Sequence, residues 1–83
     1  MSATIYYQPV NGKALSIGAP SSFLDLLDRV FHNDRSAFTV TDRDSHRLSI
    51  AASATDQTEF RAALEELAEA AMTHGEIRIW PEY

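Results

Sequence analysis

The chain has 83 residues, seven Lys or Arg against twelve Asp or Glu, a net charge of −5 and no cysteine. The length fits a single domain with one core, and the 45% apolar and 23% charged residues argue against a disordered chain. The lack of cysteine excludes disulfides and thiolate metal sites, and the acidic balance argues against nucleic-acid binding, which depends on Lys and Arg contacts to phosphates.

The first predicted elements are two strands joined as a hairpin. Residues 4–8 are rich in β-branched and aromatic side chains, which predicts a strand. Its side chains are expected to alternate between an inward pair and an outward pair, Ile5 with Tyr7 and Tyr6 with Gln8. Asn11-Gly12 is the preferred dipeptide of a two-residue type I′ turn. Residues 13–17 alternate again, with Leu15 and Ile17 on one face, and Gly18-Ala19-Pro20 is expected to break the strand.

A first amphipathic helix is predicted after this break. Ser22 and Asp25 have the spacing of a capping box. Apolar residues then recur at spacings of three and four, which places them on one helix face: Phe23, Leu26, Leu27, Val30 and Phe31. His32-Asn33 is expected to end the helix, with Asn33 in the left-handed conformation.

Residues 34–53 allow two interpretations, because periodicity cannot separate strand from helix over so short a run. One is a second hairpin with a polar turn at residues 42–46. Its inward residues are Phe38, Val40, Leu48 and Ile50, and its outward residues are Thr39, Thr41, Arg47 and Ser49. The other is a short helix that begins at Thr41 and is capped through Asp44. Its buried residues are Leu48, Ala51 and Ala52.

An internal similarity favours the hairpin. Leu15-Ser16-Ile17 recurs as Leu48-Ser49-Ile50 at an offset of 33 residues, and small residues followed by a helix come after both copies. This arrangement suggests two strand–strand–helix units.

The strongest helical pattern runs from Thr55 to Gly75. Thr55 can cap the first turn, and Gly75 can take the left-handed conformation at the end. The apolar face consists of Phe60, Ala63, Leu64, Leu67, Ala71 and Met72. The same helix carries an acidic surface that suits a basic partner or simply favours solubility, made of Glu59, Glu65, Glu66 and Glu69.

A last strand is predicted over residues 76–80 and is expected to end at Pro81. Ile77 and Ile79 point inward, and Arg78 and Trp80 point outward. The order ββα-ββα-β predicts an α+β domain over residues 1–83, a two-layer sandwich with a mainly antiparallel sheet and two amphipathic helices on one face. If residues 41–53 are helical instead, the class stays the same and the strand count falls.

No catalytic, metal or nucleotide motif is visible. The histidines His32, His46 and His74 stand apart in the sequence, and Asp42–His46 is typical of a solvated turn. We therefore predict that the chain is not an enzyme and has no cofactor or metal. No apolar run approaches the roughly 20 residues that span a bilayer, and no signal-peptide pattern follows Met1, so we expect a soluble cytoplasmic protein without a membrane partner.

The predicted function is a non-enzymatic protein-interaction domain, either a homodimer or an adaptor. It rests on Tyr6, Arg78 and Trp80 on the outer sheet face, with Thr39, Arg47 and Ser49 expected beside them, because Tyr, Trp and Arg are enriched at interface hot spots. Alternatively, Tyr6 and Trp80 cover each other. A second hypothesis is a small-molecule or anion-binding regulatory domain that uses the helix N-terminus at Gly18-Ser22. That segment lacks the lysine and glycine spacing of a phosphate loop.

Overall fold

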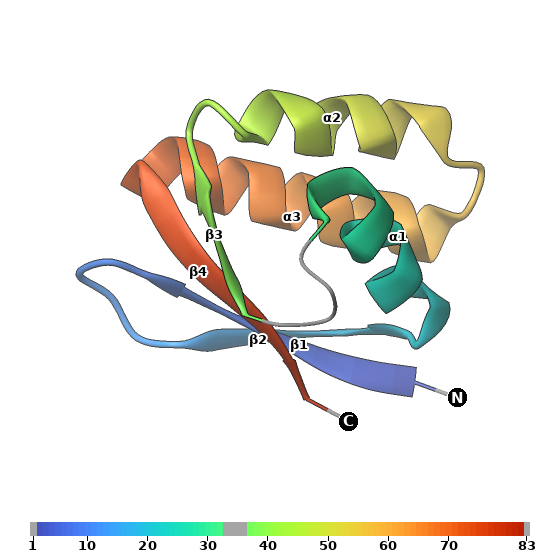
Figure 1. Cartoon of the computed structure of the whole chain (residues 1–83), viewed down its shortest axis with the longest axis horizontal. Helices are drawn as coiled ribbons and strands as arrows, with labels where there is room; N and C mark the ends of the chain where they lie inside the picture. Colours follow the sequence, from blue (N-terminus) through green and yellow to red (C-terminus); the bar gives the residue numbers. More distant parts are fainter. Residues whose placement is uncertain (1, 33–36, 83) are drawn as a thin grey trace.

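A computed structural model describes residues 2–32 and 37–82, which form four strands and three helices in two layers (Figure 1). The elements are β1 (Ser2–Pro9), β2 (Leu15–Pro20), α1 (Ser22–Phe31), β3 (Phe38–Thr41), α2 (Ser45–Ala54), α3 (Thr58–His74) and β4 (Glu76–Glu82). All neighbouring strands are antiparallel, in the order β2-β1-β4-β3, and the helices cover one face of the sheet. The predicted two-layer α+β sandwich is confirmed, with one strand fewer and one helix more than the favoured order.

The alternation predicted for the strands is confirmed. Ile5 and Tyr7 of β1 lie in the core, as do Ile77 and Ile79 of β4 and Val40 of β3. On the opposite face, Tyr6 lies directly across from Trp80. The two central strands, β1 and β4, therefore contribute both to the core and to the middle of the outer face.

The β1–β2 hairpin forms, but its predicted type I′ turn is wrong. A type I′ turn needs positive φ at both central residues; among the described residues positive φ occurs at His32 and Gly75, and at neither Asn11 nor Gly12. The Gly12 N–H instead donates to the Pro9 carbonyl at 3.1 Å. The last β1–β2 pair joins Tyr7 to Leu15, so the connection between the paired residues is longer than the predicted two-residue turn. β1 itself continues to Pro9, where it pairs with β4.

Two predicted strand ends are also wrong, because both strands include the proline that was expected to lie outside them. β2 runs to Pro20, and β4 runs through Pro81 to Glu82. Proline is tolerated where a strand lacks a neighbour on one side. β2 is an edge strand, and the described pairing of β3 with β4 stops at Ile79, short of Pro81.

α1 forms where predicted, with different ends. Its N-cap is Ser21, which makes no side-chain capping hydrogen bond, so the capping box predicted from Ser22 is wrong. At the C-terminus His32 is left-handed, with φ of 53°, and its N–H donates to the Asp28 carbonyl at 2.7 Å. Asn33, the residue predicted for this role, lies outside the described residues. Phe23, Leu24 and Leu27 are buried, whereas Leu26 and Val30 are only partly buried.

The favoured second hairpin is wrong, and the helical alternative is right, except that α2 begins at Ser45 rather than Thr41. The Asp44 carboxylate accepts from the Thr41 N–H at 3.2 Å and from its hydroxyl at 3.3 Å, which fixes the turn into α2. Leu48 and Ala52, four residues apart, are buried together, while Ile50 is 56% exposed. Residues 15–17 lie in the strand β2 and residues 48–50 lie in the helix α2, so the two similar segments have different structures and are not a structural repeat.

α3 begins at Thr58 instead of Thr55, and the predicted glycine end is confirmed. Gly75 has φ of 81°, and its N–H donates to the Ala71 carbonyl at 2.8 Å. The buried face includes most of the predicted residues together with Ala68 and Ala70. Met72 is the exception at 66% exposure, because it shares the outer helix face with Glu65 and Glu69.

Candidate functional site

The uncovered face of the sheet has two aromatic residues at its centre. Tyr6 of β1 and Trp80 of β4 lie opposite each other, with ring centroids 5.7 Å apart and ring planes 18° apart. Both side chains are partly exposed. The two rings therefore cover each other, as the alternative expectation held, and together they form one aromatic patch on a face that none of the described helices covers.

Arg78 lies beside this patch, one register step along β4. It is exposed and stands between Gln8 of β1 and Thr39 of β3. A shallow hollow of about 430 Å³ is lined by Gln8, Ala37, Arg78 and Trp80. We name Tyr6, Arg78 and Trp80 the sheet-face patch.

The other two residues expected near the patch lie elsewhere. Arg47 and Ser49 belong to α2, in the helical layer, so that expectation is wrong. Only the strand interpretation of residues 47–50 places them on the sheet. Thr39 does lie next to Arg78.

The acidic surface lies along the exposed side of α3, where Glu59, Glu65, Glu66 and Glu69 are all exposed. Glu66 also has a structural role, since its Oε2 accepts a hydrogen bond from the buried Tyr7 hydroxyl at 2.7 Å. Burial, this hydrogen bond and the charges of Glu66 and Glu69 raise the pKa of Tyr7 from 10.0 to about 12. The phenol thus stays neutral over the physiological range and ties α3 to β1.

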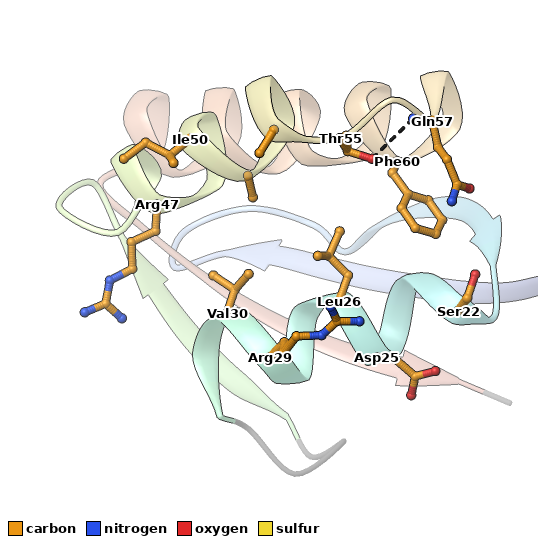
Figure 2. A pocket seen from close by; sticks show the side chains of 12 residues that line it. Ser22, Asp25, Leu26, Arg29, Val30, Arg47, Ile50, Thr55, Gln57 and Phe60 are labelled. Atoms are coloured by element: carbon orange, nitrogen blue, oxygen red, sulfur yellow. Dashed lines mark hydrogen bonds between the residues drawn. The ribbon is translucent and has the colours of Figure 1, made fainter.

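The predicted anion site at Gly18-Ser22 is divided between two elements. Gly18 and Pro20 belong to the edge strand β2, and Ser22 begins α1. Ser22 lines a different feature, a groove of about 700 Å³ between α1 and α2, which we name the α1–α2 groove (Figure 2). Sequence reasoning missed this groove.

The α1–α2 groove lies between apolar side chains that face each other without closing. Figure 2 shows Leu26 and Val30 pointing from α1 toward α2, with Ile50 on the facing helix and Phe60 at one end. The rest of the apolar wall consists of small residues, Ala51 and Ala54. Because alanines stand where longer side chains would meet α1, space remains between the helices.

The polar residues of the groove are unevenly distributed. One end has Ser22 and Asp25 of α1 near Thr55 and Gln57 of the α2–α3 connection (Figure 2). Arg29 is in the last turn of α1 and Arg47 is near the start of α2, and Figure 2 shows their guanidinium groups apart, with that of Arg29 directed toward Leu26 and Asp25. Both arginines are exposed, and neither has an ion pair or side-chain hydrogen bond with any residue in the described part of the chain.

The three histidines remain apart in the fold. His32 follows α1, His46 is in the first turn of α2 and His74 ends α3. Within residues 2–32 and 37–82, no three His, Asp or Glu side chains converge in a way that could hold a metal ion. The same part of the chain contains no helix of the length and apolar character needed to cross a membrane.

No protein-family model, no curated protein and no solved structure matches the chain.

Proposed function

We propose that this chain is a non-enzymatic protein-interaction domain of the cytoplasm, and that it binds through the sheet-face patch, with a second copy of itself as the first partner to test. The observation that carries the proposal is the stacked Tyr6–Trp80 pair in the middle of an uncovered sheet face. Aromatic residues next to an arginine are the composition of interface hot spots.

The position of the patch supports this function. Tyr6 and Trp80 come from the two central strands; β2 continues the surface beside Tyr6, and the pairing of β3 with β4 ends at Ile79, next to Trp80. An antiparallel sheet tolerates water on one face, but partly exposed aromatic rings at its centre gain more from a partner that covers them. Arg78 of β4, with Gln8 of β1 on one side of it and Thr39 of β3 on the other, adds hydrogen-bonding groups next to the rings.

Two of the side-chain contacts have a structural role. The Thr41 hydroxyl donates to the Asp44 carboxylate, and the Tyr7 hydroxyl donates to the Glu66 carboxylate. The first fixes the turn before α2, and the second joins α3 to the sheet. Both contacts are accounted for by the fold.

The test is the oligomeric state, measured by size-exclusion chromatography with light scattering at low and high salt. We expect a wild-type dimer that Trp80→Ala converts to a monomer, while Met72→Ala stays dimeric. Met72 is a matched control because it is a large apolar residue, 66% exposed, on the opposite layer. Circular dichroism confirms that each variant is folded.

A monomeric wild type, or a dimer that survives Trp80→Ala, contradicts self-association through this face. A separate protein partner is then tested by affinity capture with the wild type and both variants. A specific partner lost with Trp80→Ala and retained with Met72→Ala supports the proposal. Equal capture by all three contradicts it.

A further inference from the structure

We propose that α2 is a lid over α3: the helix opens as one unit while the rest of the domain stays folded, and Arg61 of α3 is the latch that holds it closed. The lid lies in the helical layer, whereas the sheet-face patch lies on the face of the sheet that the helices leave uncovered (Figure 1). This inference therefore goes beyond the proposed function and can fail separately from it.

α2 has little stability of its own. It has ten residues, fewer than the roughly 12–15 that an isolated helix needs in water. Ser45, Ser49 and Ser53 are weaker helix formers than alanine or leucine. The first turn has no acidic residue and contains Arg47, whose positive charge is unfavourable at the positive end of the helix dipole. The helix therefore depends on its contacts with the rest of the chain.

The turn before α2 does not cap the helix. Asp44 is the N-cap residue, but its carboxylate accepts from the N–H and the hydroxyl of Thr41 and from no N–H of α2. The turn is anchored elsewhere, since the Asp42 N–H donates to the Gly75 carbonyl at 3.0 Å. These bonds do not require α2 to be helical, so the turn can stay in place as a hinge when α2 opens.

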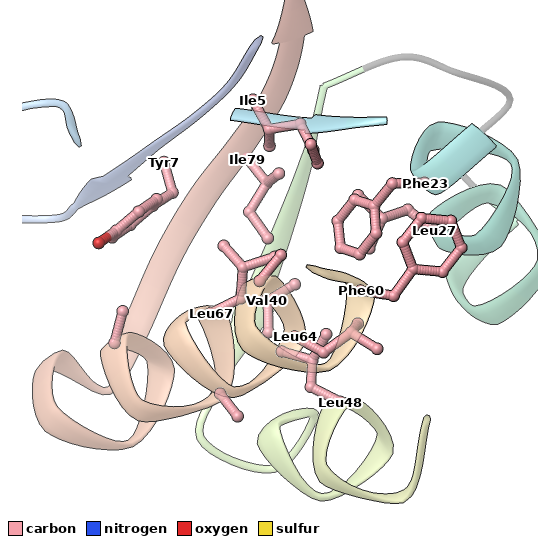
Figure 3. Close-up of a cluster of buried hydrophobic side chains, with 14 of the residues drawn as sticks. Ile5, Tyr7, Phe23, Leu27, Val40, Leu48, Phe60, Leu64, Leu67 and Ile79 are labelled. Atoms are coloured by element: carbon pink, nitrogen blue, oxygen red, sulfur yellow. The ribbon is translucent and has the colours of Figure 1, made fainter. Parts of the chain in front are cut away.

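A short apolar strip joins α2 to α3. Leu48 and Ala52 are the buried apolar residues of α2, whereas α3 buries seven. Figure 3 shows Leu48 on the side of α2 that faces α3, next to Leu64. Arg61, Leu64 and Ala68 follow one another at spacings of three and four, so they lie on one side of α3 and opening uncovers them together. Elements with few buried apolar contacts are the ones that open locally.

Arg61 supplies the cation that the C-terminal end of α2 lacks. The last turn of α2 has no basic residue, and the last carbonyls of a helix have no partner within it. Arg61 donates from Nε to the Ala52 carbonyl at 3.3 Å and from Nη2 to the Thr55 carbonyl at 2.9 Å. A cation is favourable at this end of the helix dipole. One side chain of α3 therefore holds the end of the lid, and its bonds break when the lid opens.

The test is native-state hydrogen exchange, measured for each amide by NMR at several low concentrations of urea. We expect the amides of residues 48–54 to share one protection factor, at least about tenfold below that of the most protected amides of β1 and β4. Urea should change the exchange of α2 only weakly, because opening a single helix exposes little surface compared with unfolding the domain.

A conservative core variant separates opening of the lid from unfolding of the whole domain. Ile5→Val removes one methyl group from a fully buried residue of β1 and should lower the protection of the most protected amides about twofold to tenfold. The packing around Ile5 persists when only α2 opens. The protection of residues 48–54 should therefore stay unchanged in this variant.

Variants of Arg61 test the latch. Arg61→Gln should lower the protection of residues 48–54 about threefold to tenfold, because two charge-assisted hydrogen bonds are lost. The most protected amides should lose the same factor, since these bonds also break in global unfolding. Arg61→Lys keeps the charge without the planar fork and should have a smaller effect. Arg78→Gln removes an exposed arginine of the sheet and should leave α2 unchanged.

Three results overturn the proposal. If Ile5→Val lowers the protection of α2 and of the central strands equally, α2 opens only when the whole domain unfolds. If the amides of residues 48–54 differ widely in protection and in their response to urea, the helix frays from its ends and does not open as a unit. If Arg61→Gln changes α2 no more than Arg78→Gln does, Arg61 is not the latch.

Discussion

The interface between α3 and the sheet and the α1–α2 groove are both built from apolar helix faces, but only the first is closed. On α3, Leu64 and Leu67 are fully buried toward Val40 and Ile79 of the sheet (Figure 3). Across the groove, Leu26 stays partly exposed and Ile50 more than half exposed. An apolar stripe thus shows which side of a helix avoids water, whereas the size and distance of the neighbours decide whether that side is covered.

The largest effect that this comparison predicts is at the centre of the closed interface. Leu67→Ala should lower the free energy of unfolding by about 2–5 kcal/mol, because it leaves a cavity under the sheet. Ile50→Ala removes a similar apolar side chain from the groove and should cost less than about 1 kcal/mol. Urea unfolding followed by Trp80 fluorescence measures both. Equal losses would mean that the groove is closed in solution.

Adding volume tests the same difference in the other direction. Ala71→Leu places a larger side chain in the filled interface of α3 and should destabilise the fold by about 1–3 kcal/mol. Ala54→Leu makes the identical change in the groove and should alter stability by no more than about 0.5 kcal/mol. Thermal unfolding of the two variants side by side gives the answer. A larger loss of stability with Ala54→Leu than with Ala71→Leu would contradict the difference between the two interfaces.

A polar contact at the edge of the closed interface gives a smaller and pH-dependent effect. Tyr7→Phe removes the hydrogen bond to Glu66 and should cost about 1–2 kcal/mol near neutral pH. The pKa of Tyr7 is raised from 10.0 to about 12 in the fold, so the unfolded chain loses this proton first as pH rises. The stabilisation is therefore complete below pH 10 and is lost as the pH rises toward 12.

The measurement is the difference in unfolding free energy between wild type and Tyr7→Phe at pH 8, 10 and 11, with urea as denaturant. We expect this difference to be constant up to about pH 10 and then to shrink. Other groups titrate in this range too, but they cancel because both proteins contain them. A difference that stays constant at pH 11 would show that the Tyr7 pKa is not raised.

The last comparison lies within one helix, α1, at two adjacent leucines. Leu26→Ala in the groove should cost less than about 1 kcal/mol, whereas Leu27→Ala in the core should cost about 2–5 kcal/mol. Both substitutions have the same effect on helix propensity, so their difference measures burial alone. Chemical denaturation of both variants is sufficient. Similar losses would place Leu26 in the core as well.

The sequence predicts the long or strongly alternating elements well. The periodicity correctly locates β1, α1, α3 and β4. Each of these segments is long enough for its apolar residues to fit either the helical period or the strand period clearly better than the other. α2 was not predicted as the favoured structure, because Leu48 and Ile50 fit an inward-facing strand as well as Leu48 and Ala52 fit a helix. The choice depends on tertiary packing, because α2 packs against α3 and periodicity within residues 45–54 does not show this contact.

The candidate sites also differ in whether the sequence alone predicts them. Alternation alone predicts Tyr6, Arg78 and Trp80 on one face of the sheet, and the structure places them on the uncovered face. No sequence pattern predicts the α1–α2 groove, because it depends on the distance between two helices and on alanines that leave space between them. The contact between Tyr7 and Glu66, 59 residues apart, was equally invisible.

The sheet order also determines when this protein can fold. β1 and β4 begin and end the described chain, yet they are its central strands, with Thr4 opposite Glu82. During synthesis β1 therefore has to wait for the last strand to emerge, and its unpaired edge remains exposed to other chains until then. Pairing between residues so distant in the sequence slows folding, because the entropy of closing a long loop is lost before the contacts form. The single tryptophan, stacked on Tyr6 at this junction, allows stopped-flow fluorescence to time that final pairing step directly.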